Sequence, residues 1–144
     1  AAMTIARLLE GRNVTVVTCN SGASVREAVA LLAERRIGAM PVIEAGSVAG
    51  IFSERDALYQ LHQQGPEMLD QRVGQVMTQP VVSITPETEV LEALGMITRR
   101  RIRHLPVMHG GRMVGFVSIG DLVKYRIERI EAEAEAMRAY IQAA

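Results

Sequence analysis

The chain has 144 residues, of which 49% are hydrophobic and 22% charged, and its 16 basic side chains balance its 16 acidic ones. A net charge of zero gives no general attraction to nucleic acid or to a membrane surface, and the hydrophobic content is typical of a globular protein. The single cysteine, Cys19, excludes a disulfide framework within the chain and is typical of a reducing compartment such as the cytoplasm.

The N-terminal stretch AAMTIARLL lacks the basic segment followed by a long apolar one that is typical of a secretion signal. We expect Met3 to be the natural first residue. No apolar run approaches the roughly 20 residues of a membrane-spanning helix, so we expect a cytoplasmic protein without a membrane partner.

The predicted elements follow the same order twice. Short β-branched runs at residues 14–19 and 80–84 predict strands, and helices with regularly spaced apolar residues follow each of them. Ser24 and Glu27 have the spacing of a capping box at the start of the first of these helices. Two further strands follow in each half, at residues 40–44 with 47–52 and at residues 105–108 with 112–117.

Glycine-containing turns at 45–46 and 110–111 predict that these strand pairs are hairpins. A helix then begins at Ser53 and at Ser118, so the order in each half is strand, helix, strand, strand, helix. Gly65 and Pro66 are expected to end the first of these two helices.

A shift of the sequence by 65 residues aligns the two halves without a gap from Val25 to Asp121, and it places GIFSERD at 50–56 on GFVSIGD at 115–121. We predict a first repeat at 4–64, a linker at 65–79, a second repeat at 80–126 and a C-terminal helix at 127–144. A repeat of this size buries too little apolar surface to be stable alone. We therefore expect one α+β module of two β-α-β-β-α repeats that are related by a pseudo-twofold axis.

The last helix carries apolar residues at alternating spacings of four and three, which is a heptad pattern. Such a helix needs a partner surface, because a lone amphipathic helix is marginally stable in water. A second copy of the chain and the chain's own domain are both possible partners. The residues of this apolar seam are Val123, Ile127, Ile130, Ala134, Met137 and Ile141.

The repeated Ser-x-x-Asp string has two interpretations. Ser53 and Ser118 can be helix N-caps, with Asp56 and Asp121 at the third helical position, and that role is purely structural. The same geometry also suits a phosphoribosyl group, because free N–H groups and a hydroxyl can bind phosphate while a carboxylate accepts both ribose hydroxyls.

The chain resembles a tandem cystathionine-beta-synthase (CBS) domain pair, also called a Bateman module, over residues 4–124. The resemblance is carried by MTQPVVSITPETEVLEAL, RRRIRHLPVMHGGRMVGFVSIGDLVK and RRIGAMPVIEAGSVAGIFSERD. The SERD and SIGDLVK strings and the glutamate-rich tail are similar to small stand-alone bacterial members. The resemblance implies a regulatory module without catalysis that binds AMP, ADP, ATP or NAD(H) in two clefts between the repeats, commonly as a homodimer.

Carried over by position, the resemblance implies two sets of site residues. Gly38 stands where the second repeat has Arg103, and Arg55 stands where it has Gly120, so the sites are not equivalent. One site comprises Ser118, Gly120 and Asp121 with Arg103, and its base-facing wall comes from the other repeat, namely Val17, Ile37, Gly38, Ala39 and Met40. The other comprises Ser53, Arg55 and Asp56, and its wall is Val82, Ile102, His104 and Leu105.

Other functions have weaker support. Few aromatic side chains are present to stack on bases, so nucleic acid is not an expected partner. Cys19 and the three histidines have no metal-ligand spacing, and no serine or cysteine has a base that the sequence reveals, so we predict neither a metal nor a catalytic site. An interaction module whose Ser-x-x-Asp strings are only helix caps remains an alternative, and an enzyme acting on a nucleotide is a weaker one. The sequence does not name a client protein.

Overall fold

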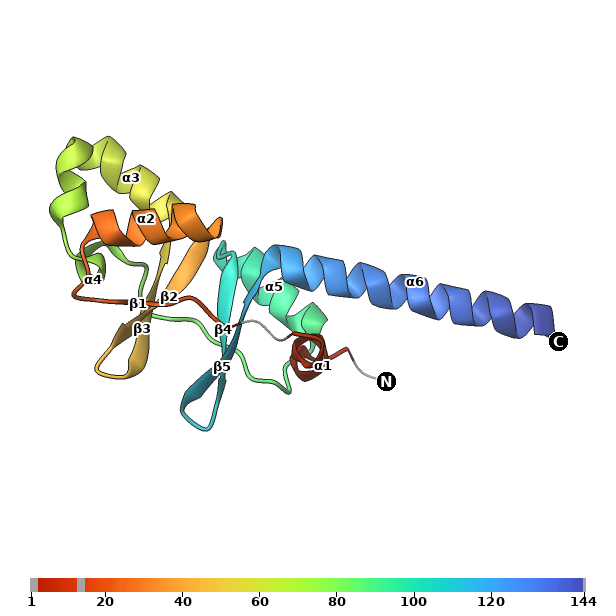
Figure 1. The fold of residues 1–144 in the computed structure, drawn as a ribbon. Helices are drawn as coiled ribbons and strands as arrows, with labels where there is room; N and C mark the ends of the chain where they lie inside the picture. The colour runs from red at the N-terminus through yellow and green to blue at the C-terminus, as the bar shows by residue number, and fades with distance from the viewer. Residues whose placement is uncertain (1–2, 13–14, 144) are drawn as a thin grey trace. The chain divides into compact units, whose positions relative to one another are not determined.

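The elements of the computed structural model alternate between helices and hairpins, and the order of the first half recurs in the second (Figure 1). The structure describes residues 3–12 and 15–143. The chain forms two units, one of Val14–Val82 and one of Ala1–Asn13 with Ser83–Ala144. The mixture of helices and strands confirms the predicted α+β class. The elements are α1 (Ile5–Glu10), β1 (Cys19–Asn20), α2 (Val25–Arg35), β2 (Ala39–Glu44), β3 (Ser47–Ser53), α3 (Glu54–Gln64), the 3₁₀ helix η1 (Gly65–Asp70), α4 (Val73–Val76), α5 (Val90–Arg100), β4 (His104–His109), β5 (Arg112–Ser118) and α6 (Ile119–Ala143).

The unit of Val14–Val82 is built on a sheet in the order β1-β2-β3. Strands β2 and β3 form the predicted antiparallel hairpin, whose turn residues Ala45 and Gly46 have φ angles of 51° and 80°. The register pairs Ala39 with Ser53, which brings the start of β2 next to the start of α3. The core lies between this sheet and the helices, and it contains Val25, Ala28, Leu32, Met40, Val42, Phe52, Met68, Val73 and Val76.

The second unit repeats this plan with the hairpin β4-β5, whose turn residues Gly110 and Gly111 also have positive φ angles. His104 pairs with Ser118, as Ala39 pairs with Ser53 in the other unit. Both hairpins change register at one equivalent place, at Val42/Ile43 and at Val107/Met108. The duplication seen in the sequence therefore extends to the details of strand pairing.

The two predicted strands that precede α2 and α5 are largely wrong. The first forms a ladder only at Cys19–Asn20, which lies parallel to Val42 and Ile43, and in the second only Ile84 makes a bridge, to Val107. Val14, where the first prediction begins, lies outside the described residues. The high β-propensity of these runs predicts strands, but a strand also needs a paired neighbour. The preference of a residue for β structure depends strongly on that context.

The segments before α2 and α5 dock short helices in matching ways. The N–H of Val73 in α4 donates to Ala23 at 2.9 Å, and the N–H of Ile5 in α1 donates to Thr88 at 2.9 Å. Ala23 and Thr88 are equivalent positions of the two repeats. The predicted linker at 65–79 is thus folded within the unit of Val14–Val82, and the N-terminal segment packs in the unit that contains the second hairpin.

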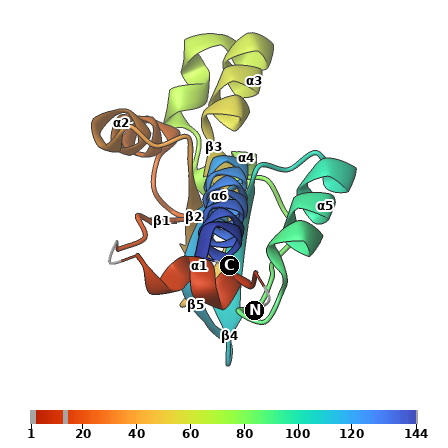
Figure 2. The ribbon, with the colours of Figure 1, turned by 90° about the vertical axis from the view of Figure 1, so that its right-hand side faces the viewer.

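Helix α6 is the longest element, with 25 residues, whereas its counterpart α3 has 11. Figure 2 shows α6 nearly end-on with α1 and α5 beside it, and α5 packs against it. Only Leu122 of this helix is buried, and every residue from 131 to 143 is exposed. Within the described ranges, no helix combines the length and the apolarity that crossing a membrane requires.

Candidate functional site

Ser53 and Asp56 form a capping box at the start of α3. The Asp56 N–H donates to Ser53 Oγ at 3.2 Å, and Asp56 Oδ2 accepts from the Ser53 N–H at 2.9 Å and from the Ser53 hydroxyl at 3.1 Å. Both side chains are half-buried. The sequence predicts this cap, and the structure confirms it.

Ser118 and Asp121 make the equivalent cap at the start of α6. The Ser118 N–H donates to Asp121 Oδ2 at 2.7 Å, and the Asp121 N–H donates to Ser118 Oγ at 3.1 Å. Each motif thus places a hydroxyl and a carboxylate at the positive end of a helix dipole. The cap alone accounts for the serine and the aspartate, so a ligand site requires hydrogen-bonding groups that the cap does not use.

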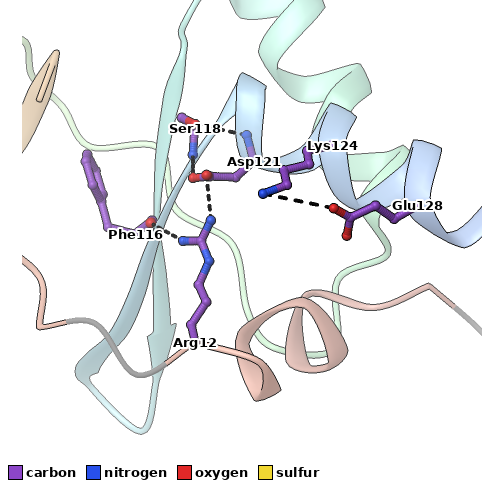
Figure 3. A network of polar contacts seen from close by, with 6 residues as sticks. All are labelled: Arg12, Phe116, Ser118, Asp121, Lys124 and Glu128. Carbon is purple, nitrogen blue, oxygen red and sulfur yellow. Dashed lines mark hydrogen bonds and ion pairs between the residues drawn. The ribbon is translucent and has the colours of Figure 1, made fainter.

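The outer carboxylate oxygens have different partners in the two halves. Asp56 Oδ1 accepts from the Thr78 hydroxyl at 2.8 Å, whereas Asp121 Oδ1 forms an ion pair with the Arg12 guanidinium at 2.6 Å. Figure 3 shows Arg12 between the Asp121 carboxylate and the backbone carbonyl of Phe116, to which it donates at 3.4 Å. One carboxylate therefore meets a neutral donor and the other a cation.

The sequence reasoning missed Thr78 and Arg12, because both lie outside the gap-free repeat. Their segments do match weakly when the chain is shifted by 68 instead of 65 residues, which places Ile5 on Val73 and Leu8 on Val76. All four of these apolar residues are buried. That shift is the only signal in the sequence for either partner.

The carboxylates retain room for additional donors. A carboxylate offers about four lone-pair sites, and Oδ1 of each aspartate has one protein donor among the described residues. Asp121 and Arg12 are each 32% exposed, so solvent or a small molecule can reach the pair. The arrangement can accept hydrogen bonds from vicinal hydroxyls while the cap stays intact.

Gly38 and Arg103, at equivalent positions of the repeats, lie beside the motif of their own half. The Glu54 N–H donates to the Gly38 carbonyl and the Ile119 N–H donates to the Arg103 carbonyl, both at 2.9 Å. The side chain of Arg103 is exposed. These two bonds tie the segment before each hairpin to the first residue of the helix that the motif caps.

In the unit of Val14–Val82, the predicted wall residues differ in burial. Val17 packs against the core, Ala39 is 5% exposed and Met40 is 0% exposed, so both Ala39 and Met40 are buried. Ile37 and Gly38 line a hollow of about 480 Å³ together with residues of α2, its C-cap and α3, namely Val29, Leu32, Ala33, Arg36, Glu54 and Ala57. Arg55 and Val82 are half-buried.

In the other unit, Ile102 is half-buried and Leu105 is fully buried. The His104 ring stacks on Phe116 with 5.5 Å between ring centroids, and Gly120 is exposed. Whether these walls meet a ligand stays a prediction.

Cys19 lies outside both motifs. Burial disfavours its thiolate and raises the pKa of the thiol to about 11, so this cysteine is a poor nucleophile near neutral pH.

Two solved structures that share the fold at lower identity hold adenosine ligands. One is CBSX2 in complex with AMP, at 22% identity and a TM-score of 0.67 over 79% of this chain and 89% of that one. The other is the CBS domain pair of protein MJ0100 with 5′-methylthioadenosine and S-adenosyl-L-methionine, at 20% identity and a TM-score of 0.77 over 90% of this chain and 99% of that one.

Two other proteins are more similar in sequence. The CBS-domain containing protein ATU1752 from Agrobacterium tumefaciens is 38% identical, with a TM-score of 0.82 over 87% of this chain and 94% of that one. The mitochondrial protein CBSX3 from Arabidopsis thaliana is 37% identical over 129 residues, and the match spans 86% of this chain and 63% of that protein. The family model of the CBS domain matches residues 12–63 and again residues 73–128. The chain therefore belongs to the CBS-domain family and carries two copies of the domain.

Proposed function

We propose that this protein is a regulatory module that binds adenosine nucleotides at its two Ser/Asp motifs and catalyses no reaction itself. The observation that carries the proposal is that the serine–aspartate arrangement at a helix N-terminus occurs in both halves. Both serines, both aspartates and both helix N-termini are present, and in each half one carboxylate oxygen has a single protein donor within the part of the chain that the structure describes.

The chemistry of each motif fits a phosphoribosyl group. The N-terminal N–H groups of α3 and α6, with the serine hydroxyl, suit the phosphate, and the carboxylate suits the two ribose hydroxyls. The related structures with AMP and with S-adenosyl-L-methionine support adenosine as the common part of the ligand. AMP, ADP, ATP and NAD(H) are the candidates.

The difference between the two halves supports unequal affinities. Arg103 and Arg12 supply cations in the half of Asp121, whereas Gly38 replaces Arg103 in the other half and Arg55 supplies the nearest cation by sequence. A ligand with more phosphate charge is expected to prefer the half with more cations.

We further propose that the module works as a homodimer in the cytoplasm and transmits the ligand signal to a client protein. The single cysteine supports a reducing compartment. A ligand can shift the chain between states only by as much as its affinities for the two states differ.

The observed capping boxes favour a second candidate, an interaction module in which both motifs only start helices. The two candidates differ in one respect that can be measured. A cap stabilises the protein without any ligand, whereas a binding motif also makes the stability depend on the ligand concentration.

A thermal-shift panel of AMP, ADP, ATP, NAD, NADH and S-adenosylmethionine tests the proposal. At a free concentration of about 100 times the dissociation constant, a ligand that binds one site should add about 2.7 kcal/mol to the free energy of unfolding. We expect at least one nucleotide to raise the melting temperature in a saturable way. If none does at millimolar concentration, the interaction module is the better account.

A further inference from the structure

Helix α6 presents an apolar seam that the rest of the described chain does not cover. Of the seam residues, Val123 is 41% exposed, Ile130 46% and Ile141 64%. From residue 131 onward every described side chain is exposed, so none of the residues that the structure describes buries the second half of the helix. In Figure 1 this half extends away from the hairpin and helices of its unit.

A helix in this position needs a partner. Residues 131–143, more than half of α6, are all exposed, and a helix of that length is marginal in water without an apolar face that packs. The seam is continuous over six positions at alternating spacings of four and three, so Ile127, Ala134 and Ile141 occupy heptad position a, and Val123, Ile130 and Met137 occupy position d. A seam of this kind fits another helix with the same period.

The charges that flank the seam distinguish the possible partners. Arg126 and Glu133 occupy heptad position g, directly before residues at position a. Glu131 and Arg138 occupy position e, directly after residues at position d. In a parallel two-stranded coiled coil, a g residue lies opposite the e residue five positions later in the other helix. Two copies of this chain would then pair Arg126 with Glu131 of the partner subunit and Glu133 with Arg138 of the partner subunit.

The antiparallel arrangement places like charges together. With the seam residues aligned, e positions face e positions and g positions face g positions, so Glu131 would face Glu131 of the partner subunit and Glu133 would face Glu133 of the partner subunit. Lys124 would face Arg138 of the partner subunit. Like-charged neighbours destabilise such contacts, whereas opposite charges stabilise them.

We propose that α6 forms a parallel, two-stranded coiled coil with α6 of a second copy of this chain. Two of the three a positions carry isoleucine, a β-branched residue that favours two strands at this position. Arg138 already pairs with Glu135 of its own helix at 2.7 Å, and its guanidinium has further donors for a second carboxylate. This interface is independent of the nucleotide proposal, and neither depends on the other.

Disulfide trapping of the full-length chain tests the geometry. In a C19A background, Ile130→Cys places a thiol at the seam, where a parallel pair brings it opposite its own copy. Ala132→Cys, on the outward face of the same turn, is the matched control. With oxidised glutathione, we expect I130C to form a covalent dimer at least about tenfold faster than A132C, because thiol exchange requires both sulfurs in reach.

Two results would overturn the proposal. One is equal, slow cross-linking of I130C and A132C, which would show that the seam does not contact a second copy of this chain. The other is rapid cross-linking only when I130C is mixed with Ala134→Cys, because residues 130 and 134 face each other in the antiparallel arrangement.

A charge swap gives a second, independent readout by sedimentation equilibrium. In a parallel dimer, Arg126→Glu places a glutamate opposite Glu131 of the partner subunit in both copies. We therefore expect the dimer dissociation constant to rise by about tenfold. The double variant R126E/E131R restores opposite charges and should recover most of that loss. An antiparallel pair would place residue 126 opposite Tyr140 of the partner subunit, so the single variant would change little, which would contradict the proposal.

Discussion

Two glycines at equivalent positions of the repeats have different steric surroundings. A Cβ atom on Gly50 would lie 2.8 Å from the Thr78 carbonyl oxygen and 2.6 Å from Met77 Sδ. A Cβ atom on Gly115 would lie 2.8 Å from Leu9 Cδ2, the end of a flexible side chain. The Thr78 carbonyl cannot move easily, because it accepts from the Ile51 N–H at 3.0 Å, and the hydroxyl of the same residue binds Asp56.

We therefore expect Gly50→Ala to cost about 2 kcal/mol of unfolding free energy, within the usual range for overpacking, because backbone must shift. Gly115→Ala should cost less than about 1 kcal/mol, because Leu9 can change rotamer and the alanine also reduces the entropy of the unfolded chain. Urea unfolding of the two variants and the wild type measures both. Equal costs would show that the Thr78 contact is not rigid.

At the scale of elements, the two hairpins differ by one residue in their turns. Ala45 has a φ angle of 51°, in the left-handed region, and its equivalent Gly110 has 59°. An alanine in that region costs roughly 1–2 kcal/mol, whereas a glycine adopts it freely at some entropic cost. No atom of the described residues lies within 4 Å of a Cβ built on Gly110, so the difference is conformational and not steric.

Ala45→Gly is accordingly expected to raise the unfolding free energy by up to about 1 kcal/mol, and Gly110→Ala to lower it by about the same amount. The urea midpoints of the two variants should move in opposite directions. A shift in the same direction would contradict the assignment of left-handed backbone to both turns.

The elements that local sequence specifies were predicted well. The hairpins follow from turn glycines and alternating apolar runs, and α3 and α6 begin at the predicted caps, since side chain and backbone three residues apart determine these features. The strands at 14–19 and 80–84 were mostly wrong, because pairing with β2 and β4 is long-range information. The docking of α1 and α4 was missed for the same reason, and with it the contacts of Arg12 and Thr78.

At the scale of the whole molecule, the duplication gives two similar but unequal Ser/Asp motifs on one family scaffold. The caps are equivalent to within a few tenths of an ångström in their shared hydrogen bonds, while the outer oxygen meets Thr78 in one half and Arg12 in the other. The sequence predicted the motif residues and the difference between Gly38 and Arg103. It did not predict that each aspartate also binds a residue that follows a short helix, Thr78 after α4 and Arg12 after α1.

The central claim is that the two aspartates bind the sugar of an adenosine nucleotide, and isothermal titration calorimetry tests it most directly. The titrant is the nucleotide with the largest thermal shift, and the proteins are the wild type, Asp56→Asn, Asp121→Asn, the double variant and Glu92→Gln. Asparagine keeps an oxygen for the cap, and Glu92 is an exposed acid in the first turn of α5 that belongs to neither motif.

We predict that each single Asp→Asn change weakens binding at its own motif by roughly 10- to 100-fold, the loss expected for hydrogen bonds to a charged group. The double variant should retain no measurable binding, and Glu92→Gln should bind as the wild type does. A folded double variant that binds the nucleotide with wild-type affinity would contradict the claim.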